Sequence, residues 1–244
     1  MALRDAYDAA IRWGIQRLLG FGPGQGMPGS LRGSDNSAGE SKSASDANED
    51  LTILVPGTVW QNYGGWTPDS NGLFRCAELA GGGISGSTKL LAWSPSGNND
   101  RDRMAGAEML RGMIAAHWFA PGAKLQVITH SHGGNVALAA SRLGLARRID
   151  TLITLNKPQM DSEMYQPGEN IGRFYNISTA GLDWIQFLGS KARRRSKRDP
   201  RAVNKIFDTS RSKLKPHAAL VWDDEIREIW WRWVEEREGG ESAS

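Results

Sequence analysis

The 244-residue chain has a single cysteine, Cys76, and no long apolar run. One cysteine excludes a disulfide within the chain, which suits a reducing compartment. No stretch approaches the roughly 18 apolar residues of a transmembrane helix. The opening segment, MALRDAYDAAIRWGIQRLLG, lacks the uninterrupted apolar core of a secretory signal. We therefore expect a cytoplasmic or peripheral-membrane protein, with signal-independent secretion left open.

The chain as a whole also lacks a strong charge of either sign, because 30 Lys and Arg face 27 Asp and Glu. The imbalance is local: residues 191–215 contain eleven Lys or Arg and two Asp. Its densest part comprises Lys191, Arg193, Arg194, Arg195, Lys197 and Arg198. An anionic membrane surface would attract such a run, at about 1 kcal/mol for each nearby basic residue. No aromatic residue interleaves it, which disfavours nucleic acid; a solvated charged surface is the other interpretation.

Three segments differ in composition. Residues 1–19 place apolar residues at helical spacing and predict an amphipathic N-terminal helix. Residues 20–50 are rich in Gly, Ser and Asp and predict a flexible linker. Residues 51–244 hold the remaining apolar periodicity, so we expect one folded domain there.

Within this domain, short apolar runs alternate with helical patterns. The predicted strands are LTILV before Pro56-Gly57, KLLAWS, KLQVIT, DTLITLN and RFYNIST. Helices are expected at 100–119, 133–144 and from Asp223 onward, and the basic stretch 184–212 is expected to be mostly helical. Such alternation predicts an α/β fold with a mostly parallel sheet that has helices on both faces.

Ser131 lies in VITHSHGGNVALAA, directly after an apolar strand and directly before a helix. This is the context of a nucleophile elbow, whose motif is G-x-S-x-G. Gly133 and Gly134 supply the small residues on the helix side, but Thr129 stands where the motif has its first glycine. Ser131 is therefore a candidate nucleophile, with an ordinary glycine-rich turn as the alternative.

A nucleophilic serine needs a histidine as base, and the chain has four histidines. His130 and His132 flank the serine, so their side chains are expected to diverge from it. His117 ends a helix and is expected at the amino edge of the sheet. His217, in KLKPHAAL after the last predicted strand, remains as the candidate base.

The acid that orients this base should lie between Ser131 and His217 and follow a strand. Asp183, shortly after RFYNIST, is the preferred candidate, and Asp161 is the second. Asp150 begins a strand, and Asp208 falls in the predicted basic helix, so neither is favoured.

An oxyanion hole requires two N–H groups. His132, which follows the nucleophile, would supply one. The turn after the first strand, VPGTVW, would supply the other from Thr58.

A binuclear metal core is the competing interpretation of His130-x-His132. Such a core needs an Asp and a His shortly after the second histidine, where this chain has Gly134 and Asn135. A metal site would therefore lack ligands, and the sequence predicts neither a metal nor a cofactor.

Together, the start LTILVPGTVW, the stretch WSPSGNNDRDRMAGAEML and the elbow ITHSHGGNVALAA resemble lipase-type α/β-hydrolases. The similarity is strongest to bacterial hydrolases that carry a WSG-N-xxx-R stretch before an HSHGGNVA elbow, and it covers roughly residues 51–220. Two departures are Thr129 in the elbow and Pro56, where many lipases have histidine. The resemblance implies an α/β-hydrolase fold over 51–244 and esterase or lipase chemistry by Ser131, Asp183 and His217.

The sequence thus predicts a serine hydrolase that cleaves carboxylic esters, with lipid or phospholipid-like substrates expected. A non-catalytic module that binds membrane or nucleic acid through residues 191–215 is the alternative. A third option retains the triad for amides, thioesters or acyl transfer.

Overall fold

The computed structural model describes residues 50–57, 87–91, 93, 99–160, 162–180, 199–212, 214 and 216–240. The predicted N-terminal helix and all of the predicted linker except Asp50 lie outside these residues. In the described ranges, none of the helices has the length and apolarity required to cross a membrane.

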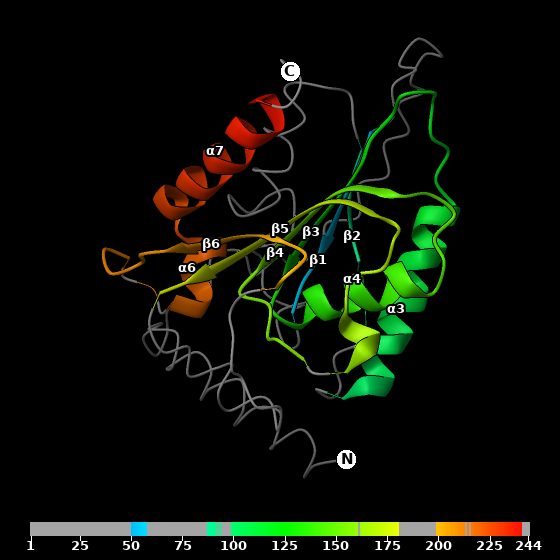
Figure 1. Ribbon diagram of the computed structural model, residues 1–244, viewed down its shortest axis with the longest axis horizontal. Coiled ribbons are helices and arrows are strands. Elements are labelled where there is room, and N and C mark those ends of the chain that lie inside the picture. Colours follow the sequence, from blue (N-terminus) through cyan, green and yellow to red (C-terminus); the bar gives the residue numbers. More distant parts are fainter. Residues whose placement is uncertain are drawn as a thin grey trace, which may run out of the picture.

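One sheet of six parallel strands organises the described part of the chain (Figure 1). The strands are β1 (Leu51–Val55), β2 (Ser87–Leu90), β3 (Leu125–His130), β4 (Ile149–Leu155), β5 (Ile171–Thr179) and β6 (Val203–Phe207). Their order in the sheet is β2-β1-β3-β4-β5-β6. Central strands of a parallel sheet are buried on both faces and read as continuous apolar runs, which is why β1, β3 and β4 were visible in the sequence.

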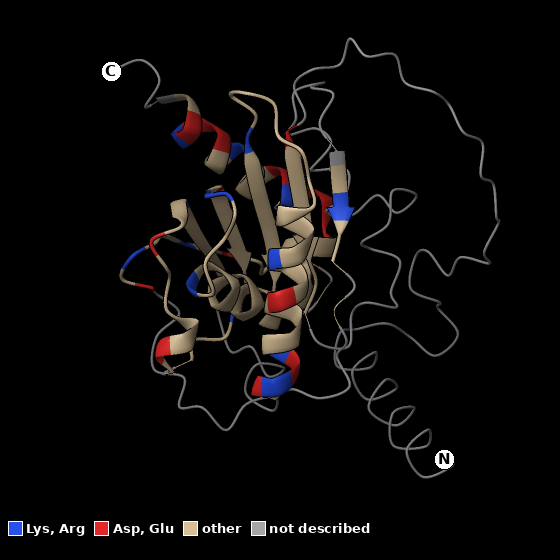
Figure 2. Cartoon of the chain, turned by 90° about the vertical axis from the view of Figure 1, so that its right-hand side faces the viewer, with Lys and Arg blue, Asp and Glu red and all other residues tan. Residues whose placement is uncertain are grey.

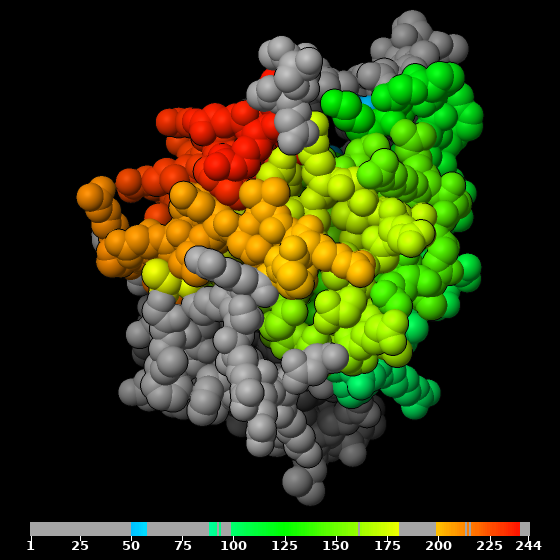
Figure 3. Space-filling model, in the orientation of Figure 1, coloured from blue at the N-terminus to red at the C-terminus, as the bar shows by residue number. Residues whose placement is uncertain are grey.

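Helices cover both faces of this sheet. They are α3 (Asp100–Ala115), α4 (His132–Arg142), α6 (Pro216–Trp222) and α7 (Asp224–Gly240), with a short 3-10 turn, η3, at Glu163–Tyr165. The predicted α/β fold with a parallel sheet and helices on both faces is confirmed. In Figure 3 the orange and red C-terminal segments gather on one side of the molecule, against the green and yellow segments that include α3 and α4.

Two apolar clusters follow from the alternation of side chains along each strand. Leu51, Ile53 and Val55 of β1 point into one cluster with residues of α3 and α4. Leu54 points to the other face and packs with residues of α6 and α7, including Trp230. Figure 2 shows the central strands almost free of charged residues, which lie mostly on helices, in loops and on an edge strand.

The prediction of a helix across 184–212 is wrong where the structure describes that segment, because Val203–Phe207 forms β6. This strand pairs only with β5 and lies at the edge of the sheet. An edge strand tolerates exposed and charged side chains, and Val203, Lys205 and Ile206 are all exposed. Its sequence, VNKIF, therefore lacks the apolar run that marked the central strands.

Parallel strands place all their carboxyl ends at one edge of the sheet. Val55 pairs with Thr129, His130 with Leu155, and Thr179 with Phe207, so these strands end in near register. The residues that follow β1, β3, β4 and β5 consequently meet at this edge, which is where open α/β sheets bind ligands.

Gly133 gives the first test of this packing. A Cβ on Gly133 would lie 2.6 Å from the Pro56 carbonyl oxygen and closer still to that of Val55. Gly133→Ala should therefore lower the free energy of unfolding by about 1–3 kcal/mol through overpacking. Gly112→Ala in α3 is the control, because a Cβ there would meet nothing within 4 Å; it should be neutral or stabilise by up to about 1 kcal/mol. Urea denaturation of both variants measures the difference, and equal effects would contradict the proposed close contact.

Candidate active site

Ser131 has an unusual backbone conformation at the turn from β3 to α4. Its φ is 52° and its ψ is −130°, a combination that residues other than glycine rarely adopt. The side chain is only 6% exposed. A strained turn of this kind between a strand and a helix presents a serine hydroxyl at the sheet edge. Ser131 therefore lies between a strand and a helix, as its sequence context predicted, and its role as nucleophile stays a prediction.

The turn after β1 lies directly against this serine. A Cβ added to Gly57 would be 2.7 Å from the Cβ of Ser131 and 3.3 Å from its Oγ. Only glycine can occupy that position without displacing Ser131. Thr58, the proposed oxyanion donor, comes next in the chain and lies outside the described residues, so its role stays a prediction.

Trp93 contacts the same turn through a hydrogen bond. Its indole Nε1 donates a hydrogen bond of 2.8 Å to the Pro56 carbonyl, and the side chain is completely buried. The ring also packs on Gly106 of α3, where a Cβ would lie 3.0 Å from it. The tryptophan of the stretch WSPSGNNDRDR therefore fixes the turn beside Ser131, a role that the motif alone did not reveal.

Thr129 occupies the place of the first motif glycine without disturbing the elbow. Its side chain is buried, and its hydroxyl donates a 3.2 Å hydrogen bond to the Ile153 carbonyl of the neighbouring strand. The backbone of α4 instead lies close to the end of β1 at Gly133. The Thr129 hydroxyl thus points toward the neighbouring strand β4.

His217 lies in the first turn of α6, whereas the sequence suggested a loop. It is 1% exposed, and its ring centroid is 4.6 Å from that of His130. Since His130 immediately precedes Ser131, the structure brings His217 to the elbow from a distant part of the chain. His117 follows α3 and precedes β3, which puts it at the opposite, amino edge of the sheet, as expected.

The acid of the proposed triad cannot be placed, because Asp183 and Asp161 both lie outside the described residues. Asp150 is the second residue of β4 and accepts a 2.7 Å hydrogen bond from the Leu125 N–H, so it lies at the amino edge. Asp208 directly follows β6, so its expected location in a helix is wrong. Its carboxylate is exposed and accepts hydrogen bonds from the Ser210 N–H and hydroxyl, which hold its pKa below the usual value.

The two histidines beside Ser131 make different contacts. His130 Nε2 lies 3.0 Å from the His217 carbonyl oxygen, whereas His132 Nδ1 lies 3.3 Å from the Asn135 amide nitrogen in α4. In the described part of the chain, no group of three or more His, Cys, Asp and Glu side chains is arranged to hold a metal ion.

Asp100, Arg103 and Tyr165 form a compact polar cluster near His132. Tyr165 donates a 2.6 Å hydrogen bond to Asp100, and Arg103 Nε donates a 2.9 Å bond to the Tyr165 oxygen. These contacts hold the pKa of Asp100 below its usual value, first through Tyr165, then through Arg103, with a smaller effect of the charge on His132. The charged residues of WSPSGNNDRDR therefore anchor the start of α3.

Sequence reasoning missed two residues that follow β4, Asn156 and Lys157. Lys157 packs on Gly134, where a Cβ would lie 2.8 Å from the lysine Cγ. Its ammonium lies 3.7 Å from Asp199, and both side chains are almost completely buried. Burial lowers the pKa of Lys157 to about 8, against the opposing attraction of Asp199. A lysine after an apolar strand reads as a surface residue, so only the fold shows that it supports the elbow helix.

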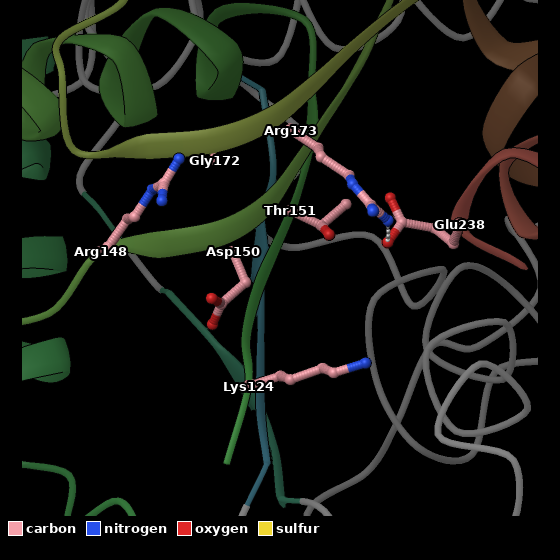
Figure 4. Close-up of a pocket in the computed structure, with 7 residues that line it drawn as sticks. All are labelled: Lys124, Arg148, Asp150, Thr151, Gly172, Arg173 and Glu238. Atoms are coloured by element: carbon pink, nitrogen blue, oxygen red, sulfur yellow. Dashed lines mark hydrogen bonds and ion pairs between the residues drawn. The ribbon is translucent and has the colours of Figure 1, made fainter. Parts of the chain in front are cut away.

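A surface cavity of about 340 Å³ lies away from these residues. Figure 4 shows Lys124, Asp150 and Gly172 lining it beside the Arg173–Glu238 ion pair. Lys124 precedes β3, and Asp150 and Gly172 lie near the starts of β4 and β5, so the cavity is at the amino edge of the sheet. It is therefore not part of the candidate active site.

Comparisons with known proteins find distant similarity only. Neither a family model nor a curated protein matches the chain. A YdeN-like hydrolase of Pectobacterium atrosepticum is 12% identical over 66% of this chain and 77% of its own, with a TM-score of 0.40. A metagenomic carboxyl esterase is 16% identical over 72% and 64%, with a TM-score of 0.35, and Aspergillus fumigatus lipase B is 17% identical over 66% and 44%, with a TM-score of 0.37. These proteins are hydrolases, but such low scores carry no argument about the reaction of this chain.

The pKa of Lys157 predicts an unusual dependence of stability on pH. In the unfolded chain the lysine pKa returns to about 10.4, so between pH 8 and 10.4 the unfolded state binds a proton that the folded state does not. Stability from this group therefore rises with pH across that window, by up to about 3 kcal/mol. Urea denaturation at pH 7.5 to 10 should show the wild type gaining on the double variant Lys157→Met, Asp199→Asn as the pH increases. A constant difference would mean that Lys157 stays protonated in the fold.

Proposed function

We propose that this chain is a serine hydrolase that cleaves carboxylic esters, with Ser131 as its nucleophile. The observation that carries the proposal is the strained backbone of Ser131 at the carboxyl edge of the sheet, with Gly57 packed against its side chain. A strained backbone conformation lowers the stability of the folded protein, and such strain is concentrated at functional sites.

The proposed base is His217. It would accept the Ser131 proton as Oγ attacks the ester carbonyl carbon, and then give that proton to the departing alcohol as the ester C–O bond breaks. Water would next attack the acyl-enzyme, passing one proton through His217 back to Ser131 Oγ and releasing the carboxylic acid. Asp183 would orient the imidazole, with Asp161 as the second candidate for that role.

The proposed oxyanion hole combines the backbone N–H groups of His132 and Thr58. His132 is the first residue of α4, where helix N–H groups lack internal partners and the helix dipole favours negative charge. The Trp93 hydrogen bond to Pro56 would keep the turn before Thr58 at a fixed distance from Ser131. Two donors aimed at the developing oxyanion are the arrangement that acyl transfer requires.

Lipid or phospholipid-like esters are the proposed substrates. The basic cluster at 191–198 follows Asp183 closely in the sequence, so it would hold an anionic surface near the site. The triad could equally serve amides, thioesters or acyl transfer. A non-catalytic module that uses residues 191–215 to bind membrane or nucleic acid is the second candidate, and it is supported by the same local charge.

A fluorophosphonate probe tests the proposed chemistry directly. The wild type should react covalently at Ser131, while Ser131→Ala should not react at all. His217→Ala should reduce the labelling rate by about 10²-fold or more because the base is lost. Asp183→Asn and Asp161→Asn, measured in parallel by intact-mass spectrometry, should identify the acid by the larger loss.

Two results would contradict this assignment. Labelling that survives His217→Ala unchanged would move the base to another residue. A well-folded wild type that does not label, and that hydrolyses no ester in a panel, would favour the non-catalytic module.

The lipid proposal has its own test. Replacing Arg193, Arg194 and Arg195 with Glu should weaken sedimentation with vesicles that contain anionic phospholipid, by about 1 kcal/mol or more for each residue. Salt should weaken wild-type binding in the same way, since it screens surface charge. Equal binding to neutral and anionic vesicles would remove the basic cluster from substrate recognition.

A further inference from the structure

We infer that Asn156 is a positioning residue that holds the start of α6, with His217, and the end of β5 beside the proposed nucleophile Ser131. This inference rests on the proposed function, because it assigns a task within the same site. Asn156 follows β4, and its side chain makes hydrogen bonds to the end of β5 and to the start of α6. The residue is only 1% exposed.

The backbone of residues 155 and 156 is tied to the elbow and to β5. The Ser131 N–H donates a 2.9 Å hydrogen bond to the Leu155 carbonyl, and the Asn156 N–H donates a 2.8 Å bond to the Ile177 carbonyl. Asn156 has a φ of 49°, in the left-handed region that asparagine enters more readily than most residues. This turn aims its side chain across the ends of the strands.

The side-chain oxygen of Asn156 holds the end of β5. It accepts hydrogen bonds from the Thr179 N–H at 3.0 Å and from the Thr179 hydroxyl at 3.2 Å. Thr179 is the last residue of β5, and Asp183 follows it by four residues in the sequence. The oxygen therefore fixes the point from which the segment with the proposed acid departs.

The side-chain nitrogen of Asn156 holds the start of α6. It donates to the Pro216 carbonyl at 3.0 Å and lies 3.4 Å from the His217 carbonyl. His130 Nε2 reaches the same His217 carbonyl at 3.0 Å. The backbone that carries the proposed base is thus held by the residue before Ser131 and by Asn156.

An amide is the side chain that suits this position. Its oxygen accepts hydrogen bonds and its nitrogen can donate two. Here the oxygen faces the Thr179 donors, and the nitrogen faces the carbonyl groups of Pro216 and His217. Aspartate has nearly the same shape, but it would place a carboxylate oxygen against the Pro216 and His217 carbonyls. Asn156→Asp therefore removes the contacts to α6 and retains those to Thr179.

The test compares Asn156→Asp with Asn176→Asp. Asn176 is also buried and also donates through its amide, at 2.8 Å to Asn204 Oδ1, and it accepts a hydrogen bond from Thr154, so these contacts link β4, β5 and β6. For each variant, the rate constant of fluorophosphonate labelling and the kcat and KM for a short-chain ester are measured per folded molecule. Circular dichroism gives the folded fraction.

Asn156→Asp should lower the labelling rate constant and kcat by about 10- to 100-fold, since misplacing a catalytic group by about 1 Å has effects of that size. KM should change less than twofold, because no substrate contact is removed. Asn176→Asp should leave both rates within twofold of the wild type. Thr179→Val, which removes one of the two bonds to the Asn156 oxygen, should give a smaller loss of kcat and serves if Asn156→Asp does not fold.

The outcomes separate the two proposals. A wild type that labels, together with an Asn156→Asp variant that labels at the same rate, would overturn the inference and leave the serine hydrolase intact. Equal losses in Asn156→Asp and Asn176→Asp would also overturn it, because they would indicate general destabilisation. A wild type that does not label would overturn the proposed function, and the inference with it.

Discussion

The contact between the start of α4 and the end of β1 is the constraint on which the rest of the candidate site depends. Gly133 and Gly57 let backbone lie against backbone and against Ser131, with no side chain between them. This close packing of backbone on backbone determines the path of the turn after β1. Trp93 then fixes the turn through the Pro56 carbonyl, and α3 fixes Trp93. The conformation of one serine is therefore maintained by elements from three parts of the sequence.

The sequence predicted the elements whose burial repeats with a regular period. Central strands and the helices α3, α4 and α7 carry that period, so their positions were correct to within a few residues. β6 was missed because an edge strand needs only one partner and can hold exposed side chains. His217 emerged by elimination among four histidines, but its place in a helix did not. Asn156 was invisible because its partners are 23 and 60 residues away, and no local pattern encodes such contacts.

Hydrogen-bonded polar side chains link β4, β5 and β6. Thr154 donates to Asn176, Asn176 donates to Asn204, and Asn204 accepts from the Asp199 N–H. Asp199 in turn faces Lys157 beside the elbow helix. A buried polar network loses most of its stabilisation if any member is misplaced. The apolar clusters drive the sheet together, while this network favours a single arrangement of its last three strands.

The apolar cluster between the sheet and helices α6 and α7 affects the order in which the chain can acquire its structure. Leu54 of β1 shares that cluster with Trp230 and Val234 of α7, so residues from the two ends of the described domain complete one core. During synthesis β1 leaves the ribosome before α6 and α7. Until these helices emerge, the contacts that they make with Leu54, Ile128 and Ile153 cannot form. Contacts of such long range slow folding, and apolar surface that stays exposed in the meantime favours aggregation.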